Sequence, residues 1–215
     1  MGNGIAGVAM KSFEHRYIPS PTGHKHGLLL LHGTGGNEDS LLELGAALDP
    51  DAALLSPRGK VSEDGANRFF RRFAEGVFDL EDVRHRAIEL GEWVSVAREE
   101  YGLERLTAVG FSNGANMATS LMLLKPEILD GVLSIRGMKV FRPQVIPNLV
   151  GKQVLLLQGE SDPIVPHATV FGLAEILSEA GAEVELHWVP AGHSLTRQDV
   201  TLAQHWLAKH ALVRS

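Results

Sequence analysis

The stretch "LTAVGFSNGANMA", Leu106–Ala118, decides the fold of this chain. An apolar run ends in Gly-Phe-Ser-Asn-Gly at residues 110–114, and an apolar run of helix-forming residues follows. These five residues fit G-x-S-x-G, which sets a serine on a sharp turn between a buried strand and a helix. Glycines are expected there because the turn brings neighbouring backbone too close for side chains. The pattern predicts that the hydroxyl of Ser112 is a nucleophile, while a glycine-rich turn with a helix-capping serine is the alternative.

Apolar runs of the same form recur along the chain and end in glycine or polar residues. They lie at residues 27–33, 51–59, 105–112, 130–137, 152–162 and 183–192. Runs without polar alternation are typical of strands buried on both faces of a parallel sheet. Helical spacing of apolar residues separates them, at about residues 81–100, 166–180 and 200–207. We therefore predict an α/β fold with a mostly parallel central sheet and helices on both faces, in one domain over residues 1–215.

Composition limits the classes of partner and site. The formal net charge is −6, which disfavours nucleic acid and anionic membranes as partners. The chain has no cysteine, so disulfides, thiolate metal sites and a cysteine nucleophile are excluded. A sequence without cysteine fits a cytoplasmic location. The apolar stretch within residues 1–12 is too short for the core of a signal peptide or for a membrane span. We expect residues 1–12 to be flexible. His24 and His26 have no accompanying ligand set, so we expect neither a metal site nor a cofactor.

Candidate reactive groups follow several of the predicted strands. In an open parallel sheet the carboxyl ends of the strands meet at one edge, where ligands bind. A serine nucleophile needs a base, and on this kind of fold the order along the chain is serine, acid, histidine. His193, in "VPAGHSL" after the last strand, is the predicted base, and His167 is the weaker rival. Asp162, in "GESDPIVP", is the predicted acid, with Glu160 as its rival.

The loop after the first long aliphatic run supplies the remaining part of the predicted site. It reads His-Gly-Thr-Gly-Gly-Asn at residues 32–37. A tetrahedral intermediate carries negative charge on the former carbonyl oxygen, and aimed N–H donors stabilise it. We predict that the backbone N–H groups of Thr34 and Asn113 form this oxyanion hole. The loop lacks the lysine and the spacing of a phosphate-binding loop.

These motifs together resemble the phospholipase/carboxylesterase branch of the α/β-hydrolases. The resemblance rests on "LLLLHGTGGN", "GFSNGANMA", "GESDPIVP" and "PAGHSL", in this order, and extends over about residues 27–209. More narrowly, the chain is similar to small bacterial carboxylesterases, a group that includes hydrolases associated with hydroquinone resistance. The resemblance implies Ser112, Asp162 and His193 as the catalytic triad, and Thr34 and Asn113 as oxyanion donors. It also implies a homodimer, since members of the family are often dimeric.

The expected activity is hydrolysis of short- to medium-chain carboxylic esters through an acyl-enzyme. A lysophospholipase or acyl-protein thioesterase is the first alternative, and a ligand receptor without turnover is the second. Too few residues separate the fourth and fifth predicted strands of the sheet for a separate lid domain. Substrate contacts must then come from loops. Of Phe69, Phe70, Phe73 and Phe78, we expect at least two to attach their loop to the core and one or two to line the pocket, with Phe69, Phe70 and Phe73 as the candidates. The neighbouring residues Arg68, Arg71 and Arg72 suggest either a site for an acidic substrate or a solvated face.

Overall fold

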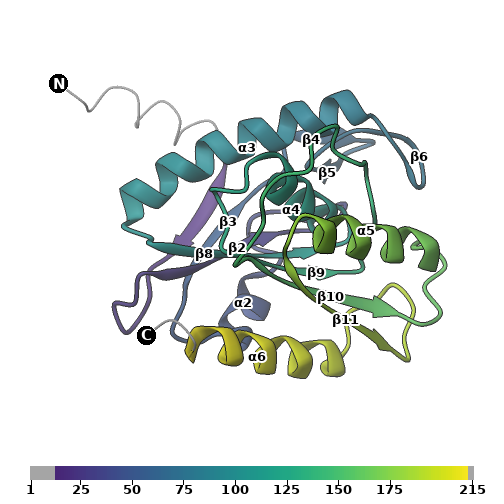
Figure 1. Cartoon of the computed structure of the whole chain (residues 1–215). Coiled ribbons are helices and arrows are strands. Elements are labelled where there is room, and N and C mark those ends of the chain that lie inside the picture. The colour runs from purple at the N-terminus through teal and green to yellow at the C-terminus, as the bar shows by residue number, and fades with distance from the viewer. Residues whose placement is uncertain (1–12, 213–215) are drawn as a thin grey trace.

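A seven-stranded sheet runs through the centre of the molecule (Figure 1). The computed structural model describes residues 13–212, so the predicted flexible start at residues 1–12 lies outside the described residues. The strand order is β1-β3-β2-β8-β9-β10-β11, and only β1 is antiparallel to its neighbour. The strands are β1 (His15–Ile18), β2 (His26–Leu31), β3 (Ala53–Pro57), β8 (Arg105–Phe111), β9 (Gly131–Ile135), β10 (Gln153–Gly159) and β11 (Glu183–Val189). The mostly parallel sheet predicted from the apolar runs is confirmed.

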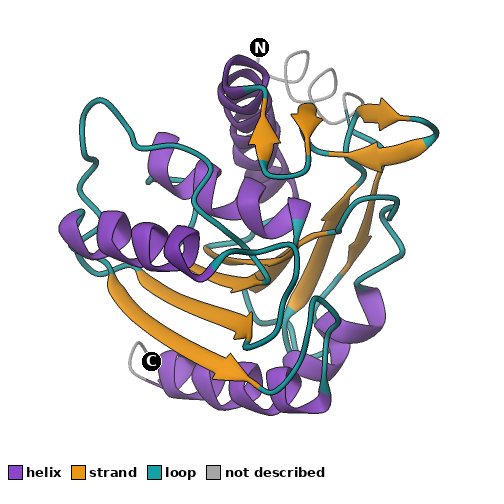
Figure 2. Cartoon of the chain, turned by 90° about the vertical axis from the view of Figure 1, so that its right-hand side faces the viewer, coloured by secondary structure: helices purple, strands orange, loops and turns teal. Residues whose placement is uncertain are grey.

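Helices cover both faces of the sheet, as expected (Figures 1 and 2). Leu29 and Leu31 of β2 point to the face covered by α3, α4 and α5, whereas Leu28 and Leu30 point to the face covered by α2 and α6. This alternation follows from the two-residue period of a strand, and it buries an unbroken aliphatic run on both sides. The helices are α2 (Leu42–Leu48), α3 (Leu80–Tyr101), α4 (Asn113–Leu124), α5 (His167–Glu179) and α6 (Arg197–Leu212).

Helix α3 shows how local sequence sets the limits of an element. Asp79 caps its start by accepting the N–H of Asp82 at 3.1 Å, and Gly102 ends it in the left-handed conformation with φ 65°. The apolar stripe predicted for this helix is buried, and it consists of Val83, Ala87, Leu90, Val94 and Ala97. The stripe anchors the helix against the sheet and α4.

Two small hairpins and the edge strand β1 were not predicted. The hairpins pair β4 (Val61–Glu63) with β5 (Ala66–Arg68), and β6 (Arg72–Ala74) with β7 (Val77–Phe78). Asp64 and Gly65 both have positive φ, 52° and 84°, as a two-residue hairpin turn requires. The Asp-Gly pair was therefore a readable signal for the first hairpin. Strands of two to four residues carry too little periodicity to be recognised without it.

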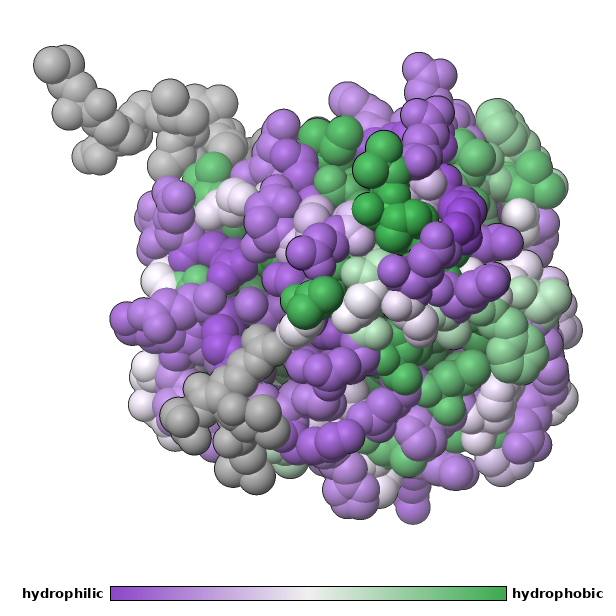
Figure 3. Space-filling model, viewed as in Figure 1, coloured by the Kyte–Doolittle hydropathy of each residue, from purple (hydrophilic) through white to green (hydrophobic). Residues whose placement is uncertain are grey.

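Residues 136–152, between β9 and β10, contain no helix or strand. The expected absence of a lid domain at this position is therefore seen in the fold. Polar side chains cover most of the face seen in Figure 3, with smaller apolar areas among them. Among the described residues, no helix has both the length and the apolar content needed to cross a membrane.

Candidate active site

Ser112 lies on a sharp turn between β8 and α4, as the sequence predicts. Its backbone has φ 52° and ψ −111°, a conformation that costs a non-glycine residue about 1–3 kcal/mol. Two backbone hydrogen bonds hold the turn: the Ser112 N–H donates to the Ile135 carbonyl at 2.9 Å, and the Asn116 N–H donates to the Ser112 carbonyl at 3.0 Å. The strained conformation is therefore fixed from β9 on one side and from α4 on the other.

The two glycines of the motif lie where no side chain fits. A Cβ on Gly110 would lie 2.5 Å from the Gly114 carbonyl oxygen, and a Cβ on Gly114 would lie 1.9 Å from the Leu31 carbonyl oxygen. Both obstacles are backbone atoms, which cannot rotate away as a side chain can. The crowding inferred from the sequence is therefore present, and Gly114 packs the turn directly against the end of β2.

His193 lies in the turn after β11, and its ring joins Ser112 to Asp162. Its Nε2 is 2.8 Å from Ser112 Oγ, and its Nδ1 is 2.8 Å from Asp162 Oδ2. An ionised carboxylate can only accept, so the short contact with Asp162 assigns the ring proton to Nδ1. Nε2 is then free to accept the proton of the Ser112 hydroxyl. This is the geometry that a serine nucleophile and its base require.

Backbone N–H groups hold the side chain of Asp162 in place. Its side chain is only 1% exposed, and its other oxygen, Oδ1, accepts the N–H groups of Ile164 at 2.8 Å and Val165 at 3.2 Å. Oδ2 is left to meet His193. The rival residues are engaged elsewhere: His167 Nε2 is 3.1 Å from the backbone carbonyl oxygen of Glu160, and among the described residues neither side chain is hydrogen-bonded to Ser112 Oγ, whose partner is His193.

The two segments that carry the predicted oxyanion donors are in contact. Residues 33–36 follow β2, and the end of β2 packs against the turn at Gly114. Neither Thr34 N–H nor Asn113 N–H has a hydrogen-bond acceptor within residues 13–212. Asn113 begins α4, so its N–H also lies at the helix end that favours negative charge.

The hairpin strand β5 holds the loop after β2, and the sequence did not show this. Gly35 N–H donates to the Asn67 carbonyl at 2.9 Å, and Asn67 Nδ2 donates to the Gly36 carbonyl at 2.9 Å. Arg68 Nη1 donates to Thr34 Oγ1 at 2.5 Å. Residues 34–36 of the loop are thereby held in place by β5.

His32 is a second residue that sequence reasoning did not single out. Its ring is 1% exposed, Nδ1 is 2.7 Å from the Gly33 carbonyl oxygen, and Nε2 accepts the Gly59 N–H at 3.0 Å. Burial lowers the pKa of His32, although the hydrogen bond to Gly33 acts in the opposite direction. The ring therefore stays neutral and joins the loop to the turn after β3. Its place directly before the glycine-rich loop was the available signal.

Of the three arginines in this loop, Arg68 fits neither the expected acidic-substrate site nor the expected solvated face, whereas Arg71 is exposed. Arg68 is 2% exposed, and it is paired with Glu63 at 3.0 Å in addition to its bond with Thr34. Arg71 pairs with Asp79 at 3.0 Å, and Arg72 pairs with Glu63 at 2.9 Å and with Glu75 at 2.7 Å. Arg68 is thus neither a solvated residue nor a free cation for an acidic substrate. Its role is to support the loop.

The candidate phenylalanines divide into two buried side chains, Phe69 and Phe70, and one exposed side chain, Phe73. Phe69 is 3% exposed with its ring 4.7 Å from that of His32, and Phe70 is fully buried against Phe78. The Phe69 N–H donates to Asn113 Oδ1 at 2.8 Å, and this bond holds the backbone of the segment against the start of α4. Neither side chain offers a surface to a substrate, so these two attach their loop to the core. Phe73, on β6, is 75% exposed.

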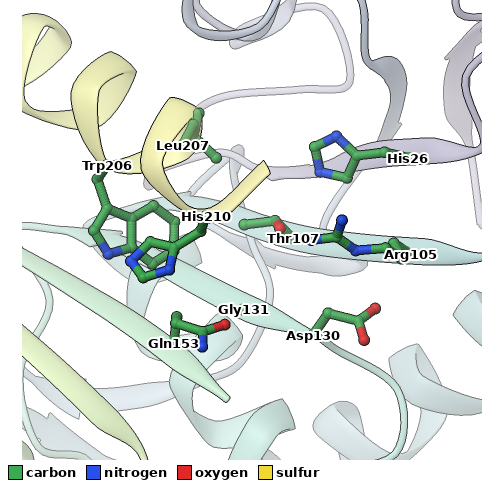
Figure 4. Close-up of a pocket in the computed structure, with 9 residues that line it drawn as sticks. All are labelled: His26, Arg105, Thr107, Asp130, Gly131, Gln153, Trp206, Leu207 and His210. Carbon is green, nitrogen blue, oxygen red and sulfur yellow. The ribbon is translucent and has the colours of Figure 1, made fainter. Parts of the chain in front are cut away.

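A small cavity lies away from the triad, and Figure 4 shows the side chains that line it. It has a volume of about 20 Å³, enough for one water molecule. Helix α6 closes it, and four strands contribute their first residues, His26, Arg105, Gly131 and Gln153. Those are the amino ends of parallel strands, so this cavity is separate from the place where Ser112, Asp162 and His193 meet. His26 is 3.4 Å from Asp49, and no group of three or more metal-binding side chains occurs within residues 13–212.

Several known proteins are similar to this chain in sequence and in fold. The family model for phospholipases and carboxylesterases matches residues 81–211. MhqD of Bacillus subtilis, whose name describes it as a hydrolase, is 41% identical over 188 residues, which cover 86% of this chain and 94% of that protein. The crystal structure of a Bacillus cereus carboxylesterase is similar with a TM-score of 0.90 and 40% identity, over 95% of this chain and 99% of that one. The crystal structure of a Mesorhizobium loti carboxylesterase is similar with a TM-score of 0.86 and 30% sequence identity, over 91% of this chain and 94% of that one. The expected α/β-hydrolase fold is confirmed.

Proposed function

The chain belongs to the phospholipase/carboxylesterase family of α/β-hydrolases, and from that premise we propose that it is a serine carboxylesterase acting on short- to medium-chain carboxylic esters. The observation that carries the proposal is the pair of 2.8 Å contacts from the ring of His193, one to Ser112 Oγ and one to Asp162 Oδ2. A nucleophile, a base and an acid that orients the base are the parts that acyl transfer through serine needs.

The reaction begins when Ser112 Oγ attacks the ester carbonyl carbon. His193 Nε2 takes the hydroxyl proton, and Asp162 stabilises the imidazolium that forms. The tetrahedral intermediate then collapses, His193 gives the proton to the leaving alcohol, and the acyl group remains on Ser112. Water attacks this acyl-enzyme with His193 again as base, which releases the acid and restores the serine.

Thr34 and Asn113 serve as oxyanion donors through their backbone N–H groups. Removing one such donor from a serine hydrolase costs about 3–4 kcal/mol of transition-state stabilisation. The proposal is supported by the lack of an acceptor for either N–H within residues 13–212. The bonds from Asn67 and Arg68 to the loop support it further, since pre-aimed donors need no reorganisation during the reaction.

The preference for shorter esters rests on the segment between β9 and β10. Residues 136–152 add no helix or strand over the site, so a long acyl chain would find no separate domain to enclose it. No cofactor is needed for this chemistry. A cytoplasmic location fits the lack of cysteine, and a homodimer, the state that family resemblance favours, can be tested by light scattering.

The test is a panel of p-nitrophenyl esters and acyl thioesters of graded chain length, from C2 to C16, with wild type and Ser112→Ala. We expect a maximum at short or medium chains that Ser112→Ala abolishes. A maximum at C12 or longer, or a preference for thioesters, would favour the lysophospholipase or thioesterase alternative. Labelling of Ser112 by a fluorophosphonate without any steady-state hydrolysis would favour a receptor.

A further inference from the structure

Arg136 is a buried charge that the proposed reaction does not use. It follows the last residue of β9, it is fully buried, and its φ of 56° is unfavourable for any residue but glycine. Strained backbone of this kind persists only where the surroundings hold it, and it concentrates at functional sites. The side chain at this position therefore calls for an explanation.

The guanidinium group of Arg136 grips the turn that carries His193. Its Nε donates to the Gly192 carbonyl at 3.0 Å, and its Nη2 donates to the Ser194 carbonyl at 2.9 Å. These carbonyls belong to the residues on either side of His193. Within residues 13–212, Arg136 is the sole hydrogen-bond donor to either of them. One side chain thus fixes the backbone both before and after the histidine.

Asp199, in the first turn of α6, holds Arg136 in this position. The two side chains form a bidentate pair, with both N–O distances 2.8 Å and both side chains fully buried. Asp199 Oδ2 also accepts the N–H and the hydroxyl of Thr196, at 2.8 and 2.7 Å. The planar fork of arginine matches a carboxylate in a way that lysine cannot. The orientation of the guanidinium is therefore set from the far side of the turn.

The backbone around Arg136 reaches the nucleophile as well. Arg136 N–H donates to the Leu157 carbonyl at 2.9 Å, and the carbonyl of the preceding residue, Ile135, accepts the N–H of Ser112 at 2.9 Å. A single short segment thus touches the serine turn through its backbone and the histidine turn through its side chain. Displacement here would change the distance between the two reacting groups.

We propose that Arg136, oriented by Asp199, is a positioning residue that holds His193 at hydrogen-bonding distance from Ser112; the proposal rests on the proposed serine esterase function. A misplacement of about 1 Å lowers the rate of such reactions by about 10²-fold. Substrate binding does not depend on the histidine ring in the same way. Loss of this clamp, the pair of hydrogen bonds from Arg136 to the carbonyls of Gly192 and Ser194, therefore lowers kcat and leaves KM close to that of wild type.

The test compares Arg136→Lys with the double variant Arg136→Met/Asp199→Leu. Lysine keeps the charge but cannot reach two carbonyls and two carboxylate oxygens together. The double variant removes both charges and so leaves no unpaired buried ion, and we expect it to fold even where Arg136→Lys does not. Arg142→Lys is the matched control, since Arg142 forms an ion pair with Glu179 on the surface, where both side chains are about half exposed.

Three measurements are made on each folded variant: kcat and KM for p-nitrophenyl butyrate, the urea unfolding midpoint, and the downfield proton resonance of His193 Nδ1–H. We expect both Arg136 variants to lose about 10²-fold in kcat with little change in KM, and to lose or broaden the resonance. The control should match wild type in all three. Wild-type kcat and an unchanged resonance in either variant would overturn the proposal. Activity that survives in Ser112→Ala would instead overturn the esterase mechanism itself, so the two failures are distinguishable.

Discussion

Gly114 lies against the end of β2, and Gly114→Ala tests whether the serine turn depends on that close approach. The new Cβ would lie 1.9 Å from the Leu31 carbonyl oxygen and 2.6 Å from that of His32. Real Cβ contacts essentially never fall below 3.0 Å, so the two backbones would have to separate by about 1.1 Å. Overpacking of a well-packed interior costs about 1–3 kcal/mol, and obstacles made of backbone lie at the upper end.

The same separation moves the loop of Thr34 away from the serine turn. We expect kcat/KM for p-nitrophenyl butyrate to fall by about 10²-fold, since a displacement of this size has that effect on reacting groups. Urea unfolding should show the loss of stability. Gly172→Ala on α5 is the control, because the atoms nearest to its Cβ would belong to the flexible side chain of Lys139. Wild-type kcat/KM together with a wild-type unfolding midpoint in Gly114→Ala would refute the reasoning.

Three further predictions concern the groups around the serine. Asp162→Asn should lower kcat by about 10⁴-fold in steady-state assays, because an amide favours the wrong tautomer of His193; a loss below tenfold would contradict this. Asn113→Ala leaves the Phe69 N–H without its acceptor, so we expect the free energy of unfolding in urea to fall by about 1–3 kcal/mol while kcat changes little. A large loss of kcat with unchanged stability would contradict the proposal that Asn113 acts through its backbone N–H. Burial lowers the pKa of His32, so the unfolded state binds the extra proton below about pH 6.5. The free energy of unfolding should therefore decrease as the pH is lowered from about 7 to about 5.5, and it should decrease less steeply in His32→Gln than in wild type. Equal pH slopes in the two proteins would contradict this role of His32.

The sequence was sufficient for the central part of the fold. Aliphatic runs such as residues 27–33 predicted buried parallel strands because a strand covered on both faces needs no polar alternation. The turn at Ser112 was predictable because G-x-S-x-G describes a local steric requirement. His193 and Asp162 could be chosen by their positions after strands, and in the structure the ring of His193 contacts both Ser112 Oγ and Asp162 Oδ2.

What the sequence left open depends on contacts between distant segments. Arg68 looked like one of three loop arginines, yet it lies buried beneath Thr34 because β5 folds back along the loop. Phe69 was one of several candidates for lining the pocket, yet its N–H is hydrogen-bonded to Asn113 Oδ1 and its ring lies beside that of His32. Such pairings join residues more than 30 positions apart, and no local period or motif announces them. The clamp of Arg136 on the His193 turn is of the same kind.

The central claim is that Ser112 is the nucleophile of an esterase. Its most direct measurement is the steady-state hydrolysis of p-nitrophenyl butyrate by wild type and by Ser112→Ala, with folding of both checked by circular dichroism. We predict measurable turnover by wild type and a loss in kcat of about 10⁴-fold or more in the folded variant. Comparable turnover by the two proteins would contradict the account.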